Sequence, residues 1–175
     1  MLPHSKGLPS EVLLVTDDAV GQSDVMDSLN ALTQQCLPEI MQPETMFRVL
    51  RVSQRNYTQR YITMHTKLFV NIDKSLSAPM MGISRDVEAT PQTEVTVSAP
   101  SLNELRLFLS HHQQQVTDAL LDGQLLVRMT DLRKHHNAHV ANEVRRHMGY
   151  SICVPKNVCA VKKGKHFLWA GSNLQ

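Results

Sequence analysis

The sequence predicts an α/β or α+β fold, in which a mixed β-sheet is covered by helices and completed by a C-terminal β-hairpin. The opening run 11–15 is aliphatic and β-branched, and it stops at Asp17 and Asp18. A run too short for a core helix is typical of a buried strand. Similar apolar runs alternate with stretches of helical spacing. A capping box, Ser101 to Glu104, precedes the longest of these helical stretches.

The first half of the chain predicts three strands and two helices. After the acids, Ser23 is a suitable N-cap, and Val25, Leu29 and Leu32 recur at helical spacing. The third strand, like the first, ends on an acid, Asp73. We expect strands over 12–15, 47–52 and 67–73, helices over 23–35 and 56–63, and an irregular segment bracketed by Pro38 and Pro43.

The second half predicts a long helical region followed by short strands. The helix that begins at Ser101 continues to about residue 133, with Gly123 as a candidate interruption. The helical pattern resumes over 134–148 and ends at Gly149, a natural C-cap. We expect strands over 81–87, 94–99, 151–154, 158–162 and 166–169, of which 94–99 alternates most clearly.

Composition narrows the class of protein. The 175 residues, 42% of them hydrophobic, suffice for one domain with an adequate core. The net charge of +2 gives no electrostatic case for nucleic acid, which we set aside as a partner. No window approaches the roughly 20 apolar residues of a membrane helix, so a soluble chain is expected. We predict a flexible lead-in over 1–10 and a single α/β domain over 11–175.

The spacing of two cysteines raises the question of a disulfide. Cys153 and Cys159 lie symmetrically about Lys156, so a hairpin turning there would place them opposite each other. In an oxidising compartment they would form a cross-strand disulfide. The alternative is two small buried thiols. With Cys36 distant in sequence, the three cysteines lack the spacing of a zinc site.

Three carboxylates form the first candidate site. Asp17, Asp18 and Asp73 follow two predicted strands, and in a parallel or mixed sheet they would converge and bind a hard cation such as magnesium. Response-regulator receiver domains place an acidic pair and a phosphorylated aspartate in this way. The lysine that ends their last strand is missing from 97–100. The alternative is that these acids cap helices or meet solvent.

A row of polar side chains forms the second candidate site. His135, His139, Glu143 and His147 are spaced by four along one predicted helix, with His136 alongside. Two of these histidines would chelate zinc or a related metal, with Glu143 as a further ligand or base. The His-Glu-x-x-His signature of metalloproteases is absent. The alternatives are a solvated polar face or a pH-sensitive surface.

No complete motif for catalysis or nucleotide binding is present. The sequence lacks a Gly-x-Ser-x-Gly elbow, a framed catalytic cysteine and a glycine-rich phosphate loop. We therefore predict no catalytic residue and no cofactor, apart from a divalent metal as an alternative. Tyr57, Tyr61, Phe69 and Trp169 would line a pocket or serve, as scattered aromatics usually do, in the core and its rim.

The order and spacing of several segments resemble an uncharacterised family of Bacteroidetes lipoproteins, a domain of unknown function. The resemblance rests on residues 11–18, on 43–47, on Arg85-Asp86 followed by Pro91-Gln92, on 95–101, and on 152–156 running to Phe167-Leu168-Trp169.

The resemblance implies a secreted lipoprotein that is tethered in the cell envelope, periplasmic or outer-membrane, with no established activity. The lipid-modified cysteine of the family is missing from this chain. Family members also continue beyond Phe167-Leu168-Trp169, so the resemblance implies that this chain is either the N-terminal part of a longer protein or a short version. Contact with a membrane is implied only through that anchor. An envelope location also makes receiver phosphorylation implausible and favours the disulfide.

These observations together favour a non-enzymatic envelope domain that binds a protein or glycan partner. The competing hypothesis is a metal-binding domain or metal-dependent enzyme that uses the aspartates or the histidine row. The third hypothesis is a degenerate receiver-like switch.

Overall fold

The computed structural model describes residues 1–36 and 44–172. The chain divides into two compact units, Met1–Val127 and Arg128–Gln175, where the sequence predicted a single domain over 11–175. The segment bracketed by Pro38 and Pro43 lies mostly outside the described residues. Among the described residues, no helix has both the length and the apolar character needed to cross a membrane.

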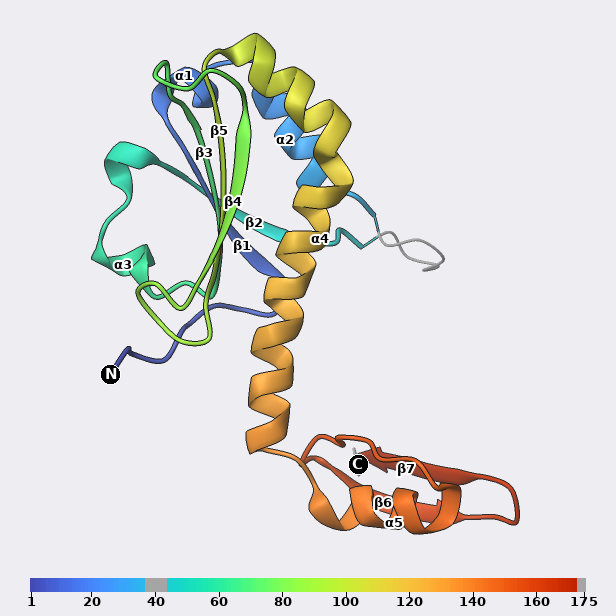
Figure 1. Cartoon of the computed structure of the whole chain (residues 1–175). Coiled ribbons are helices and arrows are strands. Elements are labelled where there is room, and N and C mark those ends of the chain that lie inside the picture. The colour runs from blue at the N-terminus through green and yellow to red at the C-terminus, as the bar shows by residue number, and fades with distance from the viewer. Residues whose placement is uncertain (37–43, 173–175) are drawn as a thin grey trace. The chain divides into compact units, whose positions relative to one another are not determined.

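The first unit is built on a five-stranded mixed sheet, which confirms the predicted fold class (Figure 1). The spatial order is β2-β1-β3-β5-β4. Neighbouring strands are parallel except β4, which pairs antiparallel with β5 at one edge. The strands are β1 (Glu11–Thr16), β2 (Arg48–Ser53), β3 (Thr66–Ile72), β4 (Met80–Arg85) and β5 (Thr93–Ala99).

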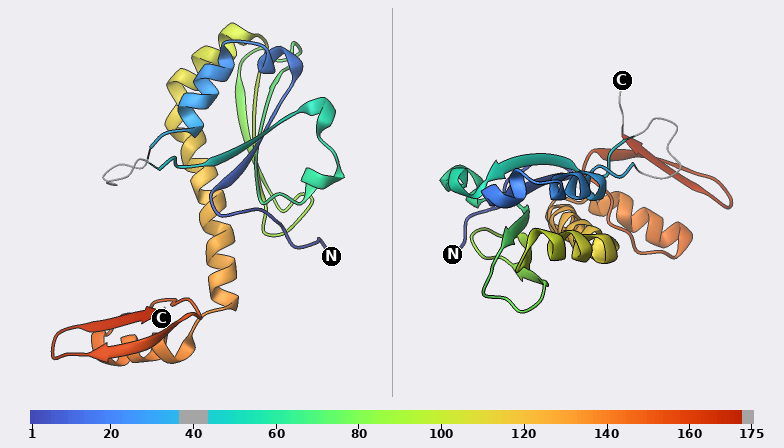
Figure 2. Two further views of the ribbon diagram at one scale, coloured as in Figure 1. Left: turned by 180° about the vertical axis from the view of Figure 1, so that it is seen from behind. Right: turned by 90° about the horizontal axis from the view of Figure 1, so that it is seen from above.

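One face of the sheet is covered by the helices α2 (Val25–Thr33) and α4 (Leu102–Lys134), which Figure 2 shows from two further directions. Both helices present aliphatic side chains to a core that also includes alternate residues of the strands. The predicted capping box starts α4, because the Glu104 backbone N–H donates to Ser101 Oγ at 3.3 Å. The core includes Val12, Leu14, Leu29, Leu32, Leu68, Val70, Val95, Val97, Leu105, Val116 and Leu120.

The opposite face of the sheet carries a smaller cluster under the connection between β2 and β3. This connection contains the short helices η1 (Gln54–Asn56) and α3 (Gln59–Ile62), close to the helix predicted over 56–63. A further short helix, α1 (Asp18–Gly21), follows β1. The smaller cluster comprises Leu13, Val15, Val52 and Met64, with Tyr57, Tyr61 and Phe69 packed against them.

Gly123 does not interrupt α4, contrary to the sequence-based expectation. The one non-helical residue inside α4 is His112, with φ −115° and ψ 16°, and its ring stacks on Phe108 at 4.3 Å between centroids. Gly123 is buried, and a Cβ added there would lie 2.9 Å from Thr93 Cβ on β5. The glycine therefore lets the helix approach the sheet closely rather than breaking it.

The N-terminal residues are held against the first unit, where the sequence predicted a flexible lead-in over 1–10. The Lys6 N–H donates to the Thr63 carbonyl at 2.7 Å, and the His65 N–H donates to the Lys6 carbonyl at 2.9 Å. The Ser5 N–H donates to the Thr90 carbonyl at 3.1 Å. These bonds order the segment because they fix its backbone to two separate loops.

The second unit packs one helix, α5 (Ala138–Met148), on the hairpin of β6 (Val158–Lys163) and β7 (Leu168–Ser172). Asn137 caps the helix N-terminus through the Val140 N–H, and Gly149 ends it with a φ of 78°, as its position predicted. The core of this unit is made of Val140, Val144 and Val154, with Val158, Val161, Leu168 and Ala170 packed against them.

The strand predicted over 151–154 does not form, and the hairpin does not turn at Lys156. The Val154 carbonyl accepts a hydrogen bond from the Asn137 N–H at 2.7 Å, so this segment is bonded to the start of α5. The hairpin turns instead between β6 and β7, where the Gly164 N–H donates to the Phe167 carbonyl at 2.9 Å. Within the described residues, two strands therefore follow α5 rather than the three predicted.

Candidate functional site

The aspartates after β1 make contacts that organise the backbone. Asp17 accepts a hydrogen bond from the Val20 N–H at 2.8 Å, as the N-cap of α1, and another from the Ile72 N–H at 2.7 Å. The second bond ties the end of β1 to the end of β3, as expected for adjacent parallel strands. Asp18 forms an exposed ion pair with Arg55 at 2.6 Å. Both carboxylates border an open pocket of about 410 Å³.

Asp73 does not join the acidic pair through its carboxylate. Its Oδ1 accepts from the N–H of Ser75 at 2.9 Å and from the hydroxyl at 2.6 Å, closing a local turn. These two hydrogen bonds lower the pKa of Asp73. Within residues 1–36 and 44–172, no group of three or more His, Cys, Asp or Glu side chains is placed to hold a metal ion.

Replacing Asp17 with alanine is expected to lower the free energy of unfolding by about 2 kcal/mol, because the N–H groups of Val20 and Ile72 lose a charged acceptor. Replacing Asp18 with alanine removes one exposed ion pair and is expected to change stability by less than about 0.5 kcal/mol. Urea unfolding of both variants measures the difference. Equal effects would contradict the structural role of Asp17.

The predicted histidine row is divided between two segments. His135 lies beyond the end of α4 and outside α5, and its Nδ1 donates to Asp131 at 2.8 Å. His139, Glu143 and His147 lie on α5, where His147 Nε2 donates to the Gly164 carbonyl at 2.8 Å. The prediction that His135 shares one helix with the other histidines was therefore wrong. The helix α4 ends before His135, and Asn137 caps the start of α5.

Glu143 serves as an ion-pair partner within the second unit. It pairs with Lys163 on β6 and, at 3.3 Å, with Arg146 on its own helix. The hydrogen bond from Lys163 lowers the pKa of Glu143. This carboxylate therefore links α5 to the hairpin.

His136, the residue beside the predicted row, donates to the Arg133 carbonyl at 2.9 Å.

The cysteines are free and exposed. Cys159 is on β6, whereas Cys153 precedes Val154 in the segment bonded to α5. The two cysteines therefore do not lie opposite each other on paired strands, which the predicted disulfide required.

The sequence reasoning missed a buried lysine on the face of the sheet opposite α2 and α4. The Lys67 side chain has 0% exposure, and its Nζ donates to Tyr57 Oη at 2.8 Å, to Glu88 at 2.6 Å and to Glu94 at 2.7 Å. The Tyr57 hydroxyl donates in turn to Glu88 at 3.0 Å. All three donors of the ammonium group are thus used. We call these four residues the Lys67 cluster.

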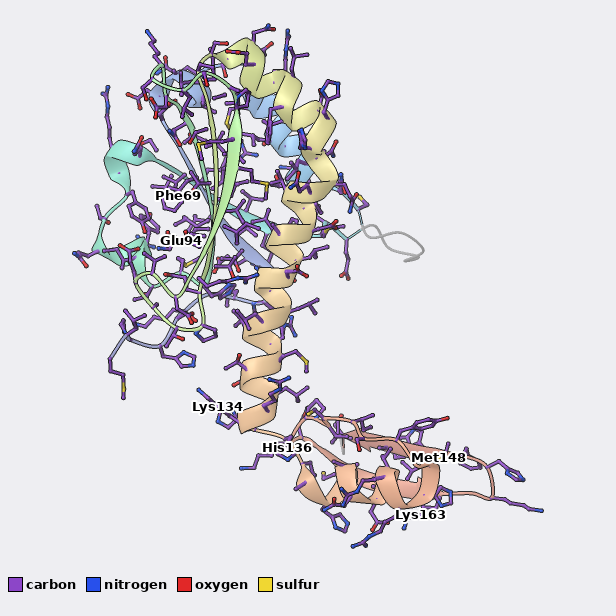
Figure 3. All side chains as sticks on the ribbon, in the orientation of Figure 1. Phe69, Glu94, Lys134, His136, Met148 and Lys163 are labelled. Carbon is purple, nitrogen blue, oxygen red and sulfur yellow. The ribbon has the colours of Figure 1, made fainter. Side chains whose placement is uncertain are left out.

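The Lys67 cluster holds two loops against the sheet. Lys67 on β3 pairs with Glu94 on β5, whereas Tyr57 and Glu88 come from connecting segments. Glu94 and Phe69 are labelled in Figure 3, on the side of the sheet where α3 lies. The Glu94 side chain is 15% exposed and that of Glu88 33% exposed. Two carboxylates against one ammonium group leave a net negative charge near solvent.

The hydrogen bonds of the cluster determine how its groups titrate. Burial opposes the charged form of Lys67, but hydrogen bonds to Glu88, Glu94 and Tyr57 outweigh it and raise the pKa of Lys67. Burial likewise opposes ionisation of Glu88, but hydrogen bonds from Lys67 and Tyr57 lower its pKa. Burial raises the pKa of Tyr57. The cluster therefore keeps Lys67 and Glu88 charged and the phenol neutral at neutral pH.

The side chain of Gln92 supports the loop that carries Glu88. This buried side chain donates to the carbonyls of Ile62 and Met64 at 2.7 and 2.9 Å, and accepts from the N–H groups of Glu88 and Ala89 at 2.9 and 3.2 Å. Such a fully bonded amide has a structural role. This structural role explains why a glutamine occupies position 92 in the Pro91-Gln92 motif, which is part of the family resemblance.

The outer edge of β4 is the most accessible strand edge of the first unit. Within the described ranges β4 pairs only with β5, and five of its six residues are exposed. Met80 and Ile83 are each about half exposed, and the only charged residue of the strand is Arg85 at its end. The opposite edge strand, β2, carries arginines at two of its six positions. Charged side chains protect an edge from pairing, so β4 is the less protected edge.

Comparison with known proteins supplies a family and no activity. No curated protein and no solved structure matches the chain. A family model described as a domain of unknown function, DUF8532, matches residues 5–131. The match takes in all five strands of the mixed sheet and most of α4, and it begins where the N-terminal segment is bonded to the first unit. Because more than half of the chain is matched, the protein belongs to the DUF8532 family of domains of unknown function.

Proposed function

We propose that this chain is a non-enzymatic binding domain that recognises a protein partner by adding a strand of that partner to β4. The observation that carries the proposal is the exposed, almost uncharged outer edge of β4. An extended peptide pairs with such an edge through main-chain hydrogen bonds, and its side chains contact alternate residues on either face.

The side chains of β4 are suited to an apolar partner strand. Met81 packs against the main core, so Ile83, two residues along, projects on the same face of the sheet. Met80 projects on the opposite face, where the Lys67 cluster lies. The two half-exposed side chains offer apolar contact on both faces, beside the negative charge of Glu94, which pairs with Ser84 in register. We therefore expect a partner strand with apolar residues and a lysine or arginine.

We further propose that the domain acts in the cell envelope as part of a Bacteroidetes lipoprotein. The support for this location is the resemblance of segments 11–18, 43–47 and 95–101, with Pro91-Gln92, to that family of lipoproteins. Fractionation of the native host, with an antibody against the chain, tests the location independently of the binding site. Recovery in the cytosolic fraction would contradict it.

Strand addition is tested by placing a charge on the edge. The variant Ile83→Lys is compared with Leu107→Lys, which alters a similarly exposed apolar residue on α4. A partner is isolated from the envelope fraction with the wild-type chain, purified, and titrated by calorimetry. We expect at least about tenfold weaker binding for Ile83→Lys and unchanged binding for Leu107→Lys, because a lysine at an edge disfavours strand pairing.

Hydrogen exchange provides the second readout of the same complex. Amides of β4 are expected to exchange more slowly with the partner bound, because an added strand pairs with the outer edge. Equal affinity for Ile83→Lys and wild type, with no new protection in β4, would overturn the proposal. A glycan as the bound component would overturn it as well. Thermal unfolding of both variants confirms that each remains folded.

A further inference from the structure

The two units of the chain carry opposite net charges, although the net charge of the whole chain is small. Arg128–Gln175 contains nine lysines and arginines against two acids, a charge of +7. Met1–Val127 contains nine against fourteen, a charge of −5. The small second unit also contains five of the nine histidines. Such a concentration of positive charge favours an anionic partner for this unit.

The hairpin of the second unit has one face packed and one face open. Val161, Leu168 and Ala170 pack toward α5. Lys162 and Trp169, which are paired in register, therefore project from the other face. Trp169 is 49% exposed, and Phe167, two residues earlier, is 60% exposed in the turn. We call this surface the outer hairpin face.

Two lysines accompany the exposed aromatics on this part of the hairpin. Lys162 Nζ lies 5.9 Å from the centre of the Trp169 ring, and Lys165 is exposed within the turn. Lys163, in contrast, is paired with Glu143 and faces α5. Figure 3 labels Lys163 and Met148 on this unit. Among the lysines of the hairpin strands and their turn, Lys162 and Lys165 are therefore available to an outside partner.

We propose that the outer hairpin face binds the surface of an anionic phospholipid membrane, with Phe167 and Trp169 in the interfacial region and Lys162 and Lys165 at the headgroups. Aromatic rings with lysine side chains beside them are typical of membrane interfaces.

A lipid surface accounts for more of the exposed residues than a nucleic acid does. Single-stranded nucleic acid would also use basic and aromatic side chains, since bases stack on rings. The second unit, however, also exposes the aliphatic Ile152 and Met148 together with Tyr150, at the end of α5 and in the segment that follows it. Aliphatic side chains gain from burial in the acyl boundary and offer no surface for base stacking. This binding mode is separate from the lipid anchor implied by the resemblance and from strand addition at β4.

The single tryptophan of the chain makes the proposal directly measurable. Because Trp169 is the only one, its emission reports on the outer hairpin face in the intact protein. We expect a blue shift on titration with vesicles containing phosphatidylglycerol, quenched by brominated lipids. Vesicles of phosphatidylcholine alone are expected to bind at least about tenfold more weakly, since each lysine near an anionic surface contributes about 1 kcal/mol.

Substitutions separate the contributions of charge and apolar contact. The double variant Lys162→Gln/Lys165→Gln is expected to reduce the partition coefficient for anionic vesicles at least about tenfold. The matched control Lys6→Gln/Lys74→Gln removes the same charge from exposed lysines of the first unit and is expected to leave it unchanged. Phe167→Ser keeps the reporter and is expected to weaken binding about tenfold.

Three results would overturn the membrane proposal. The first is an emission spectrum unchanged by anionic vesicles, and the second is equal binding to both kinds of vesicle. The third is a response to a single-stranded oligonucleotide at the same phosphate concentration without a response to vesicles, which would assign the surface to nucleic acid. Circular dichroism of each variant excludes unfolding as the cause of lost binding.

Discussion

Replacing Lys67 with methionine is expected to lower the free energy of unfolding by about 3 kcal/mol. The substitution leaves Glu88 and Glu94 close together without the ammonium group that bonds to both. Removing one partner of a buried ion pair typically costs about 3–5 kcal/mol. We expect the lower end of that range because the two carboxylates retain some contact with solvent. Urea unfolding, followed by circular dichroism, measures the change.

Two further variants show whether the loss comes from the charges. Lys74→Met removes an exposed lysine from the same unit and is expected to change stability by less than about 0.5 kcal/mol. Combining Lys67→Met with Glu88→Gln and Glu94→Gln is expected to recover part of the loss, because no uncompensated charge then remains. A triple variant less stable than the single one would contradict this explanation.

The pH dependence of Lys67→Met follows from the cluster. The pKa of Glu88 is lowered in the folded protein, so its contribution is present above its ordinary value of 4.5 and is lost as the pH falls through the folded pKa. The pKa of Lys67 is raised, so its contribution is lost only as the pH rises through the folded pKa, above 10.5. The stability difference between wild type and variant should therefore be largest at neutral pH and decrease in acid.

Replacing Gly123 with valine is expected to lower the free energy of unfolding by about 2–3 kcal/mol. A Cβ at this position would lie 2.9 Å from Thr93 Cβ and 3.2 Å from Cγ2, and the Thr93 side chain is completely buried. Valine adds two further methyl groups to that contact. Overpacking of this kind typically costs about 1–3 kcal/mol, and the higher helix propensity of valine offsets less than about 0.5 kcal/mol.

The matched control for Gly123 is another glycine of the same unit. Gly82→Val adds the same side chain to β4, where a new Cβ meets no atom within 4 Å. We expect its stability to stay within about 0.5 kcal/mol of wild type, since valine suits a strand. A Gly123→Val variant as stable as Gly82→Val would show that α4 does not need the close approach.

Much of the order of elements was predictable because local patterns encode it. The run 11–15, the alternation over 94–99 and the caps at Ser101 and Gly149 each depend on neighbours within a few residues. The strand predicted over 151–154 was wrong because Asn137, far away in sequence, bonds to Val154. Periodicity contains no information about such a partner.

The candidate sites were less predictable than the fold. Asp17 was predicted to lie beside the end of the next parallel strand, and its hydrogen bond to Ile72 places it there. Its second bond, to Val20, makes it a helix cap, which a sequence pattern does not distinguish from a ligand. Lys67 stands at the start of an apolar strand, and the sequence contained one indication of where its side chain lies. It alternates with Leu68, so it had to project from the other face of the sheet.

The sequence by itself determined the fold class and the approximate positions of most helices and strands, because these depend on contacts between residues near in the chain. Only the tertiary structure decided which side chains meet. Lys67 bonds to Glu88 and Glu94, which are 21 and 27 residues away, and Gly123 contacts Thr93 across the sheet. Sheet pairing and helix docking create these contacts, and their energies depend on burial that no local pattern specifies.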